Sequence, residues 1–184
     1  MAVDKQLYTL DQYHAFIDLP ENRDRIFELI DGEIVEKMPS FTPSRIGMNI
    51  VFFLKLYLRE HDLGYVTGEA GGYIMPGGNV VNPDVGYISK TRLPAAPERE
   101  APVPPDLAVE VMSPTDRKRA LRRKAERYLE AGTRVVWLVF PDDQVVEVYV
   151  PDEDVKTVGL DGTLDGDDLL PGFTLTVREV FGAK

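Results

Sequence analysis

One acidic residue inside an apolar segment constrains this chain more than any other feature. Residues 105–111, PDLAVEV, have the apolar, β-branched composition of a buried strand. Successive side chains of a strand point to opposite faces, so Glu110 shares a face with Ala108 and Met112. An ionised carboxylate in such surroundings is strongly unfavourable unless it is paired or binds a metal. The segment therefore predicts a polar site built into a sheet.

A second apolar segment repeats the pattern. Residues 83–88, PDVGYI, predict a strand in which Asp84 shares a face with Gly86 and Ile88. Carboxylate oxygens are the ligands that Mg²⁺ prefers in proteins. Two acids on two apolar strands therefore predict a divalent-metal site for Mg²⁺ or Mn²⁺, with Asp84 and Glu110 as ligands.

The composition limits the class of protein. The 184 residues, 43% of them hydrophobic and 28% charged, predict a single domain that spans residues 1–184. The chain has no cysteine, which excludes a disulfide scaffold and cysteine-ligated zinc and fits a cytoplasmic location. Neither an apolar leader nor a membrane-spanning run is visible, so no membrane association is expected.

The net charge of −10 disfavours a dedicated, high-affinity nucleic-acid binder, because attraction to phosphates dominates such binding. A nuclease with a local basic groove is still compatible with this charge. The arginine-rich run between 117 and 127 could contact phosphates in that way, or it could be an ordinary solvated helix face.

Capping signals and apolar periodicity place the remaining elements. Thr9 and Gln12 have the spacing of a capping box, and Thr42 with Pro43 predicts the start of a long helix. The expected helices cover 10–19, 42–60 and 113–131; hairpins cover 26–38 and 134–150; strands lie within 64–74 and 79–89; a proline-rich loop covers 93–105; and a turn with a short strand covers 169–175.

Lys124 is the notable cation of the helix that follows the Glu110 strand. At about 100° per residue, Lys124 projects within the apolar arc formed by Leu121, Ala125, Tyr128 and Leu129. Because this helix must pack back on the sheet, Lys124 can reach the Asp84 and Glu110 end. Glu28 is a further candidate, an acid on a strand face between Ile26 and Ile30.

Two carboxylates and a lysine suit the hydrolysis of a phosphodiester. The carboxylates would hold the metal, and the lysine would orient a water or stabilise developing phosphate charge. Each residue also has a purely structural interpretation: Asp84 as a strand-start aspartate bonded to backbone, Glu110 as a buried ion pair, and Lys124 as a snorkelling lysine. Lys37 is expected on the hairpin surface, Tyr128 in the core, and Glu69 in a glycine-rich turn.

These residues have a recognisable order. The chain resembles the bacterial Uma-type family of the PD-(D/E)XK restriction-endonuclease-like superfamily from Tyr8 to about Phe181. The resemblance is carried by FELIDGE at 27–33, PDV at 83–85, DLAVEVMSP at 106–114, Lys124, Tyr128, Gly132, WLV at 137–139 and LPGF at 170–173.

The resemblance implies an α/β protein with a central mixed β-sheet flanked by helices and an N-terminal β-hairpin. It assigns the superfamily aspartate to Asp84 and the acid of the (D/E)-x-K element to Glu110. Met112 occupies the lysine position of that element, so the resemblance implies that Lys124 has taken over this role. It implies a Mg²⁺-dependent endonuclease in which Glu28 supports the site, with DNA favoured over RNA as the substrate and neither excluded.

A second hypothesis comes from a different class of function. The same fold could be a catalytically idle, homodimeric interaction or regulatory domain. The proline-rich loop and the acidic composition favour this alternative. Family members often carry a histidine early in the long helix, where this chain has Ser44-Arg45-Ile46-Gly47. A homodimer is expected under either hypothesis.

Overall fold

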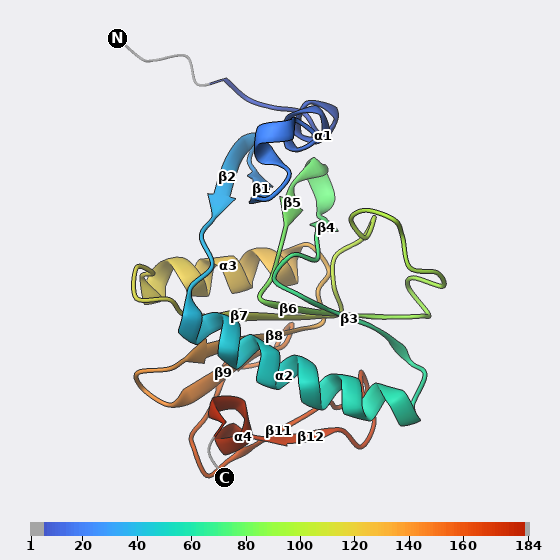
Figure 1. Ribbon diagram of the computed structural model, residues 1–184. Helices are drawn as coiled ribbons and strands as arrows, with labels where there is room; N and C mark the ends of the chain where they lie inside the picture. The colour runs from blue at the N-terminus through green and yellow to red at the C-terminus, as the bar shows by residue number, and fades with distance from the viewer. Residues whose placement is uncertain (1–5, 183–184) are drawn as a thin grey trace.

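The structure is a computed structural model that describes residues 6–182 (Figure 1). Its helices are α1 (Leu10–Ile17), α2 (Phe41–Glu60), α3 (Lys118–Glu130) and α4 (Val177–Phe181), with 3-10 turns at Pro20–Asn22 and Pro76–Gly78. The strands are β1 (Ile26–Ile30), β2 (Glu33–Lys37), β3 (Gly64–Gly68), β4 (Tyr73–Ile74), β5 (Val80–Val81), β6 (Val85–Ser89), β7 (Leu107–Val111), β8 (Val135–Phe140), β9 (Val145–Tyr149), β10 (Lys156–Val158), β11 (Thr163–Asp165) and β12 (Thr174–Thr176).

The centre of the molecule is a six-stranded mixed sheet in the order β10-β9-β8-β7-β6-β3. Strands β7 and β8 are parallel, and the other neighbours are antiparallel. A parallel pair needs a crossover connection, and α3 provides it between β7 and β8. The fold is therefore the mixed α/β architecture that the sequence predicts.

Helices cover both faces of this sheet (Figure 1). On one face, Ile46, Ile50 and Leu54 of α2 pack with Val109 and Trp137 and with the chain's C-terminal segments. On the other face, Leu121, Ala125 and Tyr128 of α3 pack against Ala108 and Leu138. Glu110 shares the Ala108 face, so its carboxylate lies on the side of the sheet that α3 covers.

A smaller sheet, in the order β2-β1-β5-β4, stands beside α3 and carries α1 at its far end (Figure 1). Its hairpin turns at Asp31 and Gly32, whose φ angles of 52° and 79° are the left-handed values that an Asp-Gly turn supplies. The predicted hairpin is therefore confirmed. Among residues 6–182, no helix combines the length and the apolarity needed to cross a membrane.

Several predicted boundaries are wrong. Ser40, not Thr42, is the N-cap of α2, and its side chain makes no capping hydrogen bond. The segment 79–89 forms two short strands, because the chain leaves β5 after Val81 to join the central sheet as β6. Helix α3 begins at Lys118 rather than in the 113–116 turn, which Asp116 closes by accepting from the Ser113 N–H at 2.7 Å.

We predict that Gly86→Ala destabilises the protein by about 1–3 kcal/mol, the usual cost of overpacking a core. A Cβ at Gly86 would lie 2.6 Å from Cε2 of Tyr73, whose hydroxyl group is hydrogen-bonded to Thr67 at 2.9 Å. Urea denaturation measures the loss. Gly68→Ala on the neighbouring β3 is the control, since nothing lies within 4 Å of its Cβ. Equal effects of the two substitutions would contradict this account of Gly86.

Candidate active site

Asp84 and Glu110 meet at one end of the central sheet. Strands β6 and β7 are antiparallel, and Val85 is opposite Val109. Asp84 precedes Val85 and Glu110 follows Val109, so Asp84 is opposite Glu110. The backbone N–H of Val111 donates a hydrogen bond of 2.7 Å to Oδ2 of Asp84. Asp84 is therefore held beside the peptide that follows Glu110, and both carboxylates lie on the α3 side.

Glu110 is almost fully buried, with a residue exposure of 4%. Its Oε1 accepts a hydrogen bond of 2.8 Å from the Tyr128 hydroxyl group and lies 2.8 Å from Nζ of Lys124. Burial raises the pKa of Glu110, and the charges of Lys124 and Lys37 offset only part of this effect. Burial also raises the pKa of Tyr128, and the charge of Glu110 adds to the shift, so this phenol stays protonated and donates.

Lys124 joins two acids from distant parts of the chain. Its Nζ lies 3.3 Å from Oε1 of Glu28 as well as 2.8 Å from Glu110. Burial by itself would lower the pKa of Lys124, but Glu110 and Glu28 more than compensate and the pKa is raised. The lysine therefore stays charged, and its side chain keeps about a quarter of its surface exposed, at 25%. It is available to a ligand in the cleft.

A second lysine lies on the opposite side of the site. Nζ of Lys37 is 2.8 Å from Oδ1 of Asp84 and donates to the Asn82 carbonyl at 2.6 Å. The backbone N–H of Asn82 donates to Oε1 of Glu28 at 2.8 Å. The segment between β5 and β6 thus links the hairpin acid to the sheet, and the site alternates acids with ammonium groups.

These groups line a cleft of about 420 Å³ between the hairpin, the first turn of α2 and the first half of α3. Its walls include Glu28, Lys37, Asp84, Glu110 and Lys124. The structure therefore brings together the four residues that the sequence singles out. Glu69 also reaches the cleft, where its oxygens accept from the Ser44 hydroxyl group at 3.1 and 3.3 Å.

The donor chemistry of the cleft suits a hard divalent ion. Mg²⁺ usually binds through one or two carboxylates together with water and substrate phosphate, not through a full protein cage. Asp84 and Glu110 supply two carboxylates, and no described residue donates a hydrogen bond to Oε2 of Glu110. Within residues 6–182, no three or more histidine, cysteine or acidic side chains form a metal-binding group. The residues fit an ion that is completed by ligand and water.

Sequence reasoning missed two members of this site. Lys37, expected on the surface, points inward with 16% of its side chain exposed. The register of the hairpin indicates this inward position, because Lys37 is opposite Ile26 and therefore lies on the same face of the hairpin as Glu28. Tyr128, expected only as core, lies four residues after Lys124 on the same side of α3, the spacing of neighbouring helix side chains.

Fold and site together define a mixed α/β protein with a cleft of carboxylates and lysines at the end of its central sheet. The chain belongs to the Uma2 family, described as "Putative restriction endonuclease", whose sequence profile matches residues 10–178. This family membership agrees with the resemblance that the motifs indicate.

A solved structure has the same fold. It is a crystal structure of "a putative nuclease belonging to DUF820" from Anabaena variabilis ATCC 29413, with a TM-score of 0.78 and 24% sequence identity. The similarity covers 94% of this chain and 97% of that one. A comparison with curated proteins gave no match.

We predict that Lys124→Met lowers the free energy of unfolding by about 3–5 kcal/mol at neutral pH, because it leaves Glu110 and Glu28 buried without their shared cation. The loss should shrink as the pH falls. Burial raises the pKa of Glu110, so on lowering the pH this carboxyl group takes up a proton in the folded state before it does so in the unfolded state. Protonation removes the unpaired buried charge, and part of the stability that Lys124→Met loses is therefore recovered in acid.

Urea denaturation at several pH values measures both effects. Lys118→Met is the matched control on the same helix, since its ion pair with Asp143 is exposed and such pairs contribute about 0–1 kcal/mol. Equal losses for the two variants, or a loss at Lys124 that grows in acid, would contradict the assigned pairing.

Proposed function

We propose that this protein is a divalent-metal-dependent nuclease of the PD-(D/E)XK type that hydrolyses phosphodiester bonds in nucleic acid, with DNA as the first substrate to test. The observation that carries the proposal is the convergence of Asp84, Glu110 and Lys124 in one cleft. The description of the family as "Putative restriction endonuclease" and that of the related structure as "a putative nuclease" support it.

Asp84 and Glu110 would hold Mg²⁺ or Mn²⁺. The ion, when bound there, would polarise a phosphoryl oxygen and lower the pKa of a water. The protein's own groups prepare this arrangement. The Val111 N–H fixes the orientation of Asp84, while the Tyr128 hydroxyl group and Lys124 fix that of Glu110.

Lys124 has the position and the charge to act on the reacting phosphate. Its ammonium group, held by Glu110 and Glu28 and partly exposed to the cleft, can donate to the attacking water or to a phosphoryl oxygen. Glu28 keeps the lysine at the cleft wall. Lys37 partly neutralises Asp84, which reduces repulsion between the acids and an incoming phosphate.

We further propose that the protein is a single domain over residues 1–184, that it is cytoplasmic and that it forms a homodimer.

A catalytically idle homodimeric interaction domain is the second candidate. One observation favours it: α2 exposes large apolar side chains, with 83% of Phe41, 62% of Met48, 59% of Phe52 and 44% of Leu56 accessible. Two experiments separate the candidates, because an idle domain needs no metal and uses Lys124 only to hold the fold together.

The first experiment measures metal binding through stability. An ion that binds only the folded protein adds about 2.7 kcal/mol at a concentration of 100 Kd, or roughly 5–10 °C in the melting temperature of a chain of this size. We expect this rise with Mg²⁺ or Mn²⁺ in the parent. Glu110→Gln should abolish most of it, because the substitution keeps the volume but removes the charged ligand.

Glu147→Gln is the matched control. Glu147 is also a buried acid of the central sheet, but it pairs with Arg122 and does not line the cleft, so this variant should keep the full metal-dependent rise. A parent protein whose melting temperature ignores both ions, or a Glu110→Gln variant that responds like the parent, would argue for the idle domain.

The second experiment measures cleavage of single-stranded and double-stranded DNA and RNA with Mg²⁺ or Mn²⁺ at low ionic strength. We expect Lys124→Ala to lower kcat by about 100-fold or more, the usual cost of losing one electrostatic partner of the transition state. Metal binding should be largely retained. Lys124→Arg should restore activity only in part, since a planar guanidinium replaces a compact ammonium.

Lys118→Ala should cleave like the parent, because Lys118 pairs with Asp143 and does not line the cleft. Each variant is compared at a temperature where circular dichroism shows it to be folded, so that lost stability is not read as lost chemistry. Absence of cleavage in the parent, or an undiminished rate in Lys124→Ala, would refute the mechanism.

A further inference from the structure

The outer side of α3 carries a row of three arginines, Arg119, Arg123 and Arg127, which we call the arginine row. Residues four apart on a helix project in nearly the same direction, and their Cα atoms lie about 6 Å apart along the axis. All three side chains are exposed. The row spans about 12 Å, close to the axial length of three to four nucleotides of one B-form strand at 3.4 Å each.

Two members of the row, Arg119 and Arg123, differ from the other cations of α3 in their pairing. Lys118 pairs with Asp143, Arg122 with Glu147, and Lys124 with Glu110. Arg119 and Arg123, in contrast, form no ion pair or hydrogen bond with any residue of the described range 6–182.

Arg127, the last member of the row, makes a 3.1 Å ion pair with Asp31 in which both side chains are mostly exposed, at 60% and 64%. Like charges four residues apart weaken a helix by about 0.2–0.5 kcal/mol. The fold therefore gains nothing from placing Arg119 and Arg123 side by side, which points to a ligand as the reason for the row.

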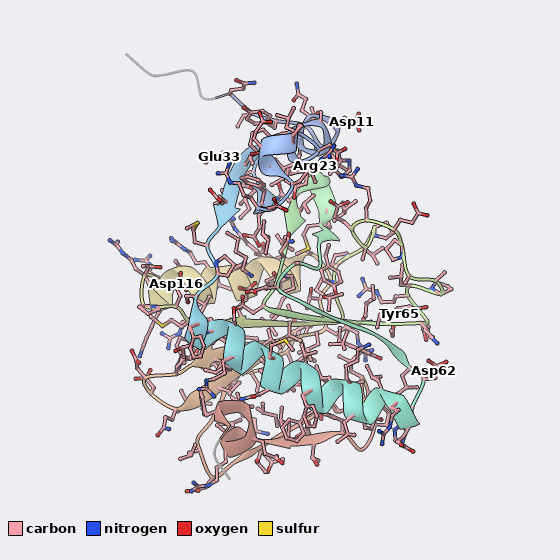
Figure 2. All side chains as sticks on the ribbon, in the orientation of Figure 1. Asp11, Arg23, Glu33, Asp62, Tyr65 and Asp116 are labelled. Atoms are coloured by element: carbon pink, nitrogen blue, oxygen red, sulfur yellow. The ribbon has the colours of Figure 1, made fainter. Side chains whose placement is uncertain are left out.

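The row borders the candidate active site. Ala120 and Lys124, the residues that directly follow Arg119 and Arg123, both line the cleft. The row itself does not line the cleft; it is turned by about 100° from the cleft wall and lies on the adjacent side of α3. Asp116 lines the cleft just before α3 and is seen in Figure 2 on the side of the molecule where α2 also begins.

We infer that the arginine row binds successive phosphates of a nucleic-acid strand that passes along α3 and places one phosphodiester in the cleft. This inference rests on the proposed function. Lys124 is held by Glu110 and Glu28 inside the cleft and cannot neutralise phosphates beyond it. In a chain of net charge −10, a local cationic row decides where a polyanion can approach. The recognised chemistry is the phosphodiester backbone, in a single strand or in one strand of a duplex.

The test measures binding in the absence of cleavage. Fluorescence anisotropy of fluorescein-labelled single-stranded and double-stranded DNA is recorded in EDTA between about 50 and 200 mM salt. The logarithm of the binding constant falls linearly with the logarithm of the salt concentration, and each phosphate contact adds about 0.7 to the steepness of this slope for single strands and about 0.9 for duplexes. The double variant Arg119→Gln/Arg123→Gln should therefore bind more weakly, with a slope smaller by about 1.4 for single strands or about 1.8 for duplexes.

The double variant Lys118→Gln/Arg59→Gln removes two charges as well, from exposed positions outside the row. It should keep the salt slope of the parent. If it weakens binding as much as the row variant does, only net charge matters and the inference is wrong. It is also wrong if the parent binds neither DNA, or if the row variant binds like the parent.

Cleavage assays then separate this inference from the proposed function. The row variant should raise KM with kcat unchanged, because the row does not touch the reacting phosphate. If DNA binding depends on the row but the protein never cleaves, the nuclease proposal is wrong and the inference about the row holds. If the protein cleaves and the row variant binds DNA like the parent, the nuclease proposal holds and the inference about the row is wrong.

Discussion

The interaction on which the rest of this structure depends is the buried contact of Glu110 with Lys124 and Tyr128. A carboxylate in the middle of a central strand requires a cation and a hydrogen-bond donor within reach. Helix α3 meets both needs only when it packs back over β7. The same lysine then holds Glu28, which ties the N-terminal hairpin to the central sheet. One buried charge thus fixes the relative positions of three segments that are distant in sequence.

Such a network is a poor way to stabilise a protein, because desolvating the charges costs about as much as their attraction returns. Replacing all its members together by apolar side chains is often neutral or better, although removing a single partner is costly. The arrangement is easier to understand as preparation for a ligand. Acids and ammonium groups alternate around the cleft, so each carboxylate is oriented by a donor before any ion or phosphate arrives. Preorganised charge of this kind is what electrostatic catalysis requires.

The charge distribution of the whole chain adds a second constraint. The net charge of −10 opposes any polyanion, yet the first half of α3 concentrates cations beside the cleft. Some of these cations are bound to acids of the protein itself, while Arg119 and Arg123 pair with no acid among residues 6–182. An acidic protein can therefore still present a narrow, local surface to phosphates without attracting nucleic acid over its whole area.

The sequence by itself indicated most of the elements and, through its family resemblance, the mixed α/β class. It also singled out Glu28, Asp84, Glu110 and Lys124 as candidates, because an acid on an apolar strand and a lysine within an apolar helix arc are visible as breaks in periodicity. The pairing of Lys37 with Asp84, the contact of Tyr128 with Glu110 and the split of segment 79–89 into β5 and β6 were decided only by the tertiary structure. A lysine on a hairpin and a tyrosine in a core look ordinary in sequence. Their role depends on which elements pack against them, and local propensity does not encode that packing.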